Sequence, residues 1–210
     1  MKKLAISILV ALLFVVIVEQ NASATTLQAK DYIPNTKNTY IYKVKGFYIN
    51  SYKTNYKQQY KNGYWYMYDY DTNIKKTLGN YIEKDKYVIK KDGLYTVGKQ
   101  VQYDTDVDIK QKLLPLTFKK GTSFKSTFTS NGMIFTQNSK VVSTTGKLKI
   151  ANKPYKNVVK VSSTSSTNKK EKSISYYIKG MGKVKSFWNN GESRVTKNKG
   201  TTTISEVIKR

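Results

Sequence analysis

The chain has 210 residues and a formal net charge of +25 at pH 7, from 38 Lys and Arg against 13 Asp and Glu, and it contains neither Cys nor His. The missing Cys excludes disulfides and thiolate nucleophiles, and the missing His excludes Ser-His-Asp triads and imidazole metal ligands. Zinc is thereby excluded too and no glycine-rich phosphate loop is present, so we expect no enzymatic activity, no metal site and no cofactor.

The first 24 residues have the three parts of a secretory signal. Lys2 and Lys3 form a basic start, residues 4–18 are almost continuously apolar, and Ala22-Ser23-Ala24 supplies the small residues that signal peptidase requires. The alternative is an uncleaved anchor, but an apolar run of about 15 residues is shorter than the roughly 20 that span a bilayer. We therefore predict cleavage after Ala24 and a secreted, extracellular product that associates with the cell wall by charge, if at all.

From residue 38 onward, polar and apolar residues alternate and turn signals recur, with no sustained helical period. Tyr40, Tyr42 and Val44 share one side of the first such stretch. Turns are expected at Lys91-Asp92-Gly93, at Asn131-Gly132, in the polar loop between residues 161 and 174, and at Asn189-Asn190-Gly191, before a last strand at residues 201–210.

This pattern predicts an all-β, mainly antiparallel fold, built as one strongly curved sheet or a partly closed barrel with at most one or two short helices. The best helix candidate is residues 106–114. We expect residues 25–37 to be a lead-in and residues 38–210 to form one β-rich domain. Weak similarity between residues 31–112 and 113–210 hints at an internal duplication.

Two rows of tyrosines stand out in this alternation. Tyr48, Tyr52, Tyr56 and Tyr60 recur every four residues, and Tyr64, Tyr66, Tyr68 and Tyr70 recur every two. In strands both spacings place all the rings of a row on one face. Because the other face of the first row is mostly polar, we expect both rows to line the concave side of the sheet. The rings either form the core or leave a groove for a sugar ring or an apolar chain, with Tyr52, Tyr56, Tyr64, Tyr66 and Tyr68 as the candidate ligand-binding residues.

The excess of positive charge comes almost entirely from Lys, since Arg occurs only at Arg194 and Arg210. Lysine acts as a flexible point charge, which suits diffuse attraction to polyanions better than shaped recognition. The alternative is a solvated face that keeps a Tyr-rich chain soluble. The candidate polyanion-binding residues are Lys169, Lys170, Lys172, Lys179, Lys183 and Lys185.

Two C-terminal segments carry a further pattern, "LLPLTFKKGTSFKSTF" at residues 113–128 and "YKNVVKVSS…ISYYIKGMGKVKSFW" at residues 155–188. With its Pro-x-Lys-x-Gly-x-aromatic segment and its Tyr-Tyr-x-Lys-Gly-x-Gly-x-Val-Lys motif, this part of the chain resembles a group of exported proteins and lipoproteins of Gram-positive bacteria. The resemblance implies an extracytoplasmic location, a β-rich fold and no catalytic residues to carry over. The chain departs from many members by lacking the lipobox Cys. Within the motif, Gly180 and Gly182 predict a bend flanked by core residues Tyr177 and Val184.

Three functions follow from these features. The leading expectation is a secreted, non-enzymatic, cationic β-protein that associates with anionic cell-envelope or extracellular polymers, with no specific nucleic acid and no transmembrane span after signal cleavage. The second is a carrier that holds an apolar or sugar ligand in the Tyr-lined concavity. The third is a secreted toxin, immunity or host-interaction factor, which no particular residue favours.

Overall fold

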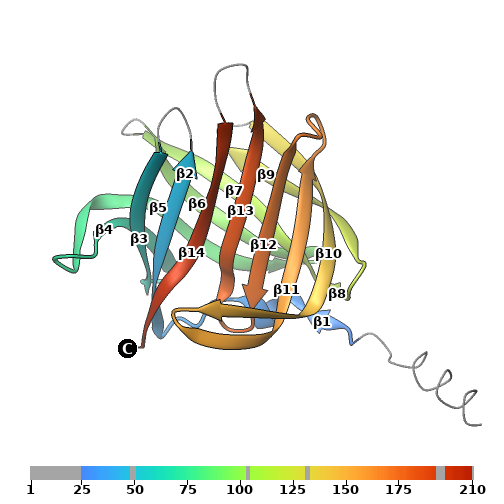
Figure 1. Cartoon of the computed structure of the whole chain (residues 1–210), viewed down its shortest axis with the longest axis horizontal. Coiled ribbons are helices and arrows are strands. Elements are labelled where there is room, and N and C mark those ends of the chain that lie inside the picture. Colours follow the sequence, from blue (N-terminus) through green and yellow to red (C-terminus); the bar gives the residue numbers. More distant parts are fainter. Residues whose placement is uncertain (1–24, 48–50, 103–104, 131–132, 193–196, 210) are drawn as a thin grey trace, which may run out of the picture.

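The computed structural model describes residues 25–47, 51–102, 105–130, 133–192 and 197–209, and the signal predicted for residues 1–24 lies outside them. Within the described residues, twelve antiparallel strands close into a barrel (Figure 1). In order around the barrel they are β10 (Met133–Ile150), β11 (Lys153–Ser165), β12 (Glu171–Ile178), β13 (Gly182–Glu192), β14 (Lys197–Lys209), β2 (Asn38–Phe47), β3 (Ser51–Lys61), β4 (Tyr64–Asp71), β5 (Lys76–Lys90), β6 (Gly93–Gln102), β7 (Thr105–Pro115) and β9 (Ser123–Ser130). The predicted all-β antiparallel fold is confirmed, with the barrel closed around its full circumference.

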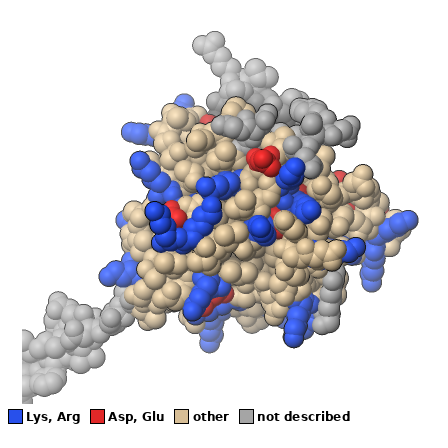
Figure 2. Space-filling view, turned by 180° about the vertical axis from the view of Figure 1, so that it is seen from behind, with Lys and Arg blue, Asp and Glu red and all other residues tan. Residues whose placement is uncertain are grey.

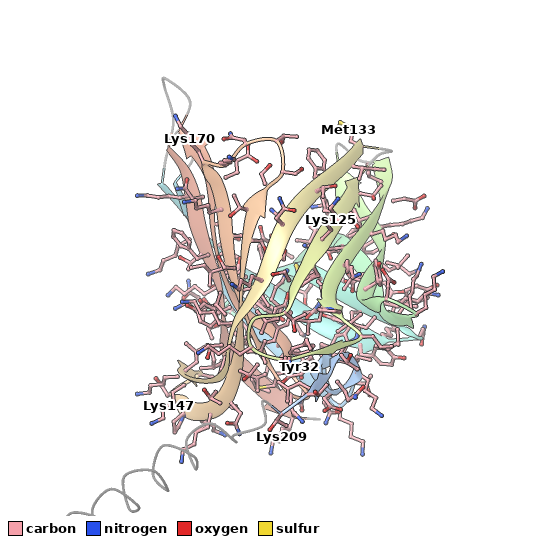
Figure 3. The ribbon with its side chains drawn as sticks, turned by 90° about the vertical axis from the view of Figure 1, so that its right-hand side faces the viewer. Tyr32, Lys125, Met133, Lys147, Lys170 and Lys209 are labelled. Atoms are coloured by element: carbon pink, nitrogen blue, oxygen red, sulfur yellow. The ribbon has the colours of Figure 1, made fainter. Side chains whose placement is uncertain are left out.

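The N-terminal segment closes one end of this barrel. It forms β1 (Leu27–Gln28) and the 3-10 helix η1 (Ala29–Tyr32), and β1 pairs with the short strand β8 (Thr117–Phe118). The backbone N–H of Ala29 donates a hydrogen bond of 2.9 Å to the carbonyl of Leu116. The rings of Tyr32 and Phe118, both buried, lie 5.6 Å apart between centroids. This end is therefore sealed by an apolar cluster. Figure 3 shows Tyr32 towards one end of the molecule and Met133 and Lys170 at the other.

The inside of the barrel differs from one side to the other. The inward-facing residues of β2–β5 include many aromatic rings, among them Tyr40, Tyr42, Tyr60, Trp65 and Tyr87. Those of β9–β11 include four small, buried serines, Ser126, Ser139, Ser163 and Ser165. Since a serine fills much less volume than a tyrosine, the serine positions leave space inside the barrel.

Most strands follow the predicted alternation. Tyr40, Tyr42 and Val44 are all buried on one face of β2, as expected. The hairpin predicted around Asp92-Gly93 joins β5 to β6, and the polar loop predicted after residue 161 joins β11 to β12. The Asn131-Gly132 turn lies outside the described residues, although the strands on either side of it pair.

Two expectations about the elements are wrong. Residues 106–114 belong to strand β7, where Val107, Ile109 and Leu113, at spacings of two and four, are buried. The turn predicted at Asn189-Asn190-Gly191 is absent, because β13 continues to Glu192, where it still pairs with β14 after a register shift between Asn189 and Glu192.

The glycine bend is confirmed as a tight connection between β12 and β13. Gly180 and Gly182 have φ of +70° and +71°, a conformation that residues with a Cβ rarely adopt. Tyr177 and Val184 on either side are 4% and 0% exposed. No helix in the described part of the chain is long and apolar enough to cross a membrane.

Candidate functional site

The turn between β3 and β4 decides where the tyrosines point. Asn62 and Gly63 have φ of +50° and +83°, which is typical of a two-residue hairpin turn, and Lys61 pairs directly with Tyr64. Directly opposed residues share a face of the sheet, so an even-numbered residue of β3 shares its face with an odd-numbered residue of β4. Tyr60 therefore faces Trp65, and the two tyrosine rows lie on opposite faces.

The expectation that both rows line the concave side is consequently wrong for the second row. Tyr56 and Tyr60 point into the barrel, whereas Tyr64, Tyr66 and Tyr68 lie on its outer wall. Tyr52 belongs to β3, but its side chain lies outside what the structure describes. The five candidate ligand-binding tyrosines are therefore not brought together into one site.

On the outer wall, Tyr64 borders a basic groove of about 400 Å³. The ammonium groups of Lys84 and Lys86 lie 4.5 Å and 5.6 Å from the centre of its ring, within the range of a cation–π interaction. Lys99 and Lys110 lie along the same groove, contributed by β6 and β7. We call the surface of Tyr64, Lys84, Lys86, Lys99 and Lys110 the basic groove.

Strand register holds these lysines close to one another. Lys84 lies directly opposite Lys99, and Lys86 lies opposite Val97, which is in turn opposite Lys110. Like charges directly across a strand pair repel each other and destabilise the sheet. Asp108, which lies opposite Lys99 in the same groove, already offsets part of that repulsion, and a negatively charged group bound beside Lys84, Lys86 and Lys110 would offset more of it.

The six lysines expected to bind polyanions are dispersed. Lys169, Lys170 and Lys172 are exposed at the start of β12, whereas Lys179 lies at its other end, where its ammonium group pairs with Asp31 at 2.9 Å. Lys185 lies opposite the outward-facing Tyr176. These residues therefore form no single patch.

Lys183 faces the barrel interior, so its expected role as a surface contact is wrong. It pairs with Tyr177, which points inward, whereas Lys185 pairs with Tyr176, which points outward. The chain from Lys183 to Lys185 thus spans two residues where β12 spans one. This β-bulge turns the two lysines to opposite faces.

Lys183 lines an inner cavity of about 320 Å³ together with Glu83 and Asp85 of β5. The two carboxyl groups share a hydrogen bond. Burial, followed by the charge of Glu83, raises the pKa of Asp85 well above its ordinary value, against the opposing effect of Lys183. Burial likewise raises the pKa of Glu83 and lowers that of Lys183. The arrangement favours a protonated Asp85 donating to a Glu83 carboxylate that balances the Lys183 charge.

Tyrosines and glutamines complete the wall of the inner cavity. The hydroxyl of Tyr42 donates to Oε1 of Gln58 at 3.1 Å, and burial raises the pKa values of Tyr42 and Tyr87. Among the described residues, no group of three or more acidic side chains is placed to hold a metal ion. Chemically, the cavity offers hydrogen-bonding groups and one shared proton.

Sequence reasoning missed this acidic pair, although a signal for it exists. In "EKDKY", residues 83–87, the acids alternate with Lys84 and Lys86 and stand in phase with Tyr87. In a strand, that order places the acids and the tyrosine on one face and the lysines on the other.

Comparisons with known proteins give the following findings. No protein-family model matches the chain, and no curated protein matches it. Two solved structures are similar: a presumed exported protein with a YmcC-like fold from Bacteroides fragilis and a presumed lipoprotein from Parabacteroides distasonis. The first has a TM-score of 0.46 at 10% identity, covering 85% of this chain and 99% of its own, and the second has 0.36 at 9%, covering 84% and 98%. Neither likeness is close enough to carry an argument about function.

Proposed function

We propose that this chain is an exported, non-enzymatic protein that associates with anionic polymers of the cell envelope or the extracellular space. Export is supported by the basic, apolar and small-residue parts of the predicted signal at residues 1–24. The observation that carries the binding role is the basic groove, where lysines from β5, β6 and β7 meet beside Tyr64. Figure 2 shows lysines spread across one face of the molecule with few acids between them.

The groove suits a polymer of phosphate or carboxylate groups. A row of lysines attracts any chain of negative charges, and a half-buried tyrosine ring beside them offers an apolar surface for the parts between the charges. Because Lys is a point charge, we expect attraction to charge density without selection for one polymer geometry. The proposed partners are therefore anionic wall or extracellular polymers as a chemical class.

The chain contains no His and no Cys, the commonest acid–base and nucleophilic side chains, which supports a role in binding without catalysis. The acidic pair of the inner cavity is already engaged, since its two carboxyl groups bond to each other and face Lys183. We therefore propose no reaction for this chain.

The test measures affinity for linear inorganic polyphosphate by calorimetry over a series of salt concentrations. The groove variant carries Lys84→Gln, Lys86→Gln and Lys110→Gln. The charge-matched control carries Lys119→Gln, Lys120→Gln and Lys153→Gln, three exposed lysines away from the groove.

We expect the wild-type affinity to fall as salt rises, because surface attraction is screened over about 10 Å at 0.1 M salt. At about 1 kcal/mol per lysine near an anionic surface, the groove variant should bind about 100-fold more weakly at low salt and show a smaller salt dependence. Equal losses in the two variants would overturn the groove assignment. Binding that does not respond to salt would overturn the function itself.

A further inference from the structure

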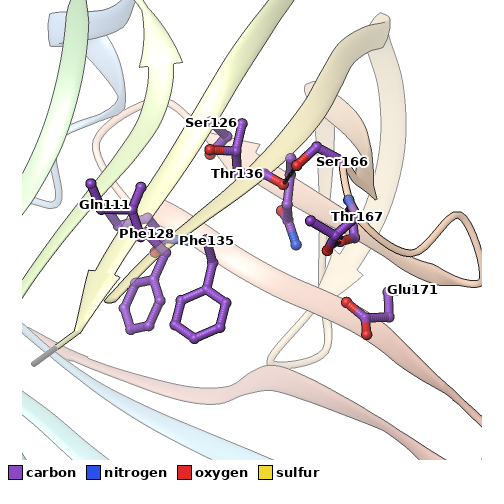
Figure 4. A pocket seen from close by; sticks show the side chains of 11 residues that line it. Gln111, Ser126, Phe128, Phe135, Thr136, Ser166, Thr167 and Glu171 are labelled. Atoms are coloured by element: carbon purple, nitrogen blue, oxygen red, sulfur yellow. Dashed lines mark hydrogen bonds between the residues drawn. The ribbon is translucent and has the colours of Figure 1, made fainter. Parts of the chain in front are cut away.

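We infer that the open end of the barrel is a binding site for a neutral, polyhydroxylated ring compound, such as a short uncharged oligosaccharide. A pocket of about 880 Å³ lies there, between β7, β9, β10 and the connection from β11 to β12 (Figure 4). Its volume falls within the range of small-molecule sites, roughly 300–1,000 Å³. This site is separate from the basic groove and from the tyrosines singled out in the sequence.

The floor of the pocket is an aromatic platform held by strand register. Gln111, Phe128 and Phe135 stand directly opposite one another across β7, β9 and β10, so all three point inward. The rings of Phe128 and Phe135 lie 6.1 Å apart with 32° between their planes, and Figure 4 shows them side by side. Phe135 is 51% exposed, which leaves part of its ring free to cover the apolar C–H face of a sugar ring.

The wall beside the platform is built of amides and hydroxyls. Gln137 lies opposite Ser126 on one side and Ser165 on the other, in the row next to the aromatic platform. Amide and hydroxyl groups both donate and accept hydrogen bonds, as the hydroxyls of a sugar require. Several such groups beside an aromatic surface suit a ring that has one apolar face and a polar edge.

Hydrogen bonds hold the far side of the pocket in place. Ser166 donates from its hydroxyl to the carbonyl of Thr136 at 2.9 Å, which ties the β11–β12 connection to β10. Ser165 and Thr167 share a hydroxyl–hydroxyl bond of 3.1 Å. The carboxylate of Glu171 accepts from the Asn168 amide at 3.1 Å through one oxygen. The polar groups are therefore already positioned before a ligand arrives, which lowers the entropic cost of binding.

The charge of this pocket separates its ligand from that of the outer wall. Among the described residues that line it there is one acid, Glu171, and no lysine, in a chain with 38 Lys and Arg residues. A polyanion would find no countercharge here and would meet a carboxylate. A carboxylate accepts hydrogen bonds from hydroxyl groups, so the lining favours an uncharged polyol.

The pocket continues into the barrel. Gln111 and Phe128 line both the open-end pocket and the inner cavity that holds Glu83 and Asp85. Below the platform, the buried serines Ser139 and Ser163 are hydrogen-bonded to each other at 2.8 Å and leave room where larger side chains would close the barrel. The site is therefore a deep pocket that adjoins the inner cavity, and it is not confined to the rim of the barrel.

The experiment titrates the protein with neutral oligosaccharides, namely maltotetraose, cellotetraose and chitotetraose, and follows binding by calorimetry and by saturation-transfer NMR. We expect at least one of them to bind and its affinity to stay the same from about 50 mM to about 500 mM salt, because no charge is paired. Phe135→Ala and Gln137→Ala should each weaken that affinity about tenfold or more. Phe187→Ala, which removes a 39%-exposed ring from the outer face of β13, is the matched control and should leave it unchanged.

Three outcomes would overturn the inference: no binding of any of the three sugars at millimolar concentration, equal weakening by Phe187→Ala, or binding of 1-dodecanol in place of the sugars. Thermal unfolding of each variant confirms that it is folded. Polyphosphate binding should be unaffected by Phe135→Ala and Gln137→Ala. The test of this site and the test of the basic groove can therefore fail independently.

Discussion

Tyr60 and Trp65 stand directly opposite each other across the β3–β4 hairpin, with ring centroids 5.5 Å apart and planes inclined at 59°. Because side chains alternate between the two faces of a strand, this pairing determines the face on which each remaining residue of β3 and β4 lies. Trp65 lies in the core, at 2% exposure, and Tyr64, Tyr66 and Tyr68 lie on the outer wall. This assignment places Tyr64 on the same face as the lysines of the basic groove.

Trp65→Ala should therefore cost far more stability than Tyr66→Ala. Loss of a buried tryptophan leaves a cavity among Tyr40, Tyr60 and Tyr87, and the expected loss in the free energy of unfolding is about 3–5 kcal/mol. Tyr66 makes partly exposed ring contacts on the outer wall, where about 1 kcal/mol is expected. Urea unfolding measures both, and similar losses for the two variants would contradict the assigned faces.

Asp85→Asn should flatten the dependence of stability on pH. The pKa of Asp85 is raised in the folded state, so the folded protein holds a proton that the unfolded chain has released. Stability is then full at pH below the ordinary carboxyl pKa and declines as pH rises above it. Asn cannot ionise but can still donate a hydrogen bond to Glu83. Urea midpoints between pH 4 and pH 8 should fall less with pH in the variant.

The control for this series is Asp108→Asn, which removes an exposed acid opposite Lys99 on the outer wall and leaves the interior pair intact. Lys183→Met should have the reverse effect and steepen the decline, because Lys183 opposes the rise in the pKa values of both carboxyl groups. A pH profile that Asp85→Asn leaves unaltered is incompatible with the interior arrangement.

Gly182→Ala should destabilise the barrel more than Gly180→Ala. Both glycines have positive φ, and a Cβ in that conformation costs about 1–2 kcal/mol. At Gly182 the added Cβ would also come within 2.8 Å of Cγ of Pro34, whereas at Gly180 it meets nothing within 4 Å. Thermal unfolding of the two variants gives the comparison. A smaller loss at Gly182 would show that the N-terminal segment does not pack against the bend.

Lys112→Gln should raise the pKa of Asp92. Hydrogen bonds from Lys112, at 2.8 Å, and from Tyr95, at 2.6 Å, hold the pKa of this carboxyl at about 2. Without the lysine, the pKa should move towards the ordinary value of about 3.9. A depressed pKa adds stability at neutral pH that is lost as pH falls from about 4 to about 2. An NMR titration of the carboxyl carbon measures the shift, with Lys110→Gln on the same face as control.

The sequence is informative about this fold wherever alternation is regular. Tyr40, Tyr42 and Val44, for example, are recognisable as core residues from spacing alone. The predictions of facing fail where one additional or missing residue in a turn or strand exchanges the inward and outward faces of the residues that follow. The length of the Asn62-Gly63 turn reverses the second tyrosine row, and a bulge separates Lys183 from Lys185. Period-two reasoning cannot detect a bulge, since the extra residue leaves no mark in composition.

The candidate sites were harder to predict, because each one combines residues from several strands. The basic groove needs Lys84, Lys99 and Lys110 in register across three strands. The open-end platform needs Gln111, Phe128 and Phe135 in the same row. Gln111 lies beside Phe128 only because β7 pairs with β9, and no local sequence pattern predicts that pairing.

The docking of the N-terminal segment has a consequence for how the molecule is oriented. Gly180 donates its N–H to the carbonyl of Asp31 at 2.8 Å and accepts from the N–H of Asn35 at 2.8 Å, so the start of the folded chain is fixed to the sealed end of the barrel. If the protein were attached to a surface through that end, the open end of the barrel would lie on the side away from the surface. Phe128 and Phe135 would then face the solvent.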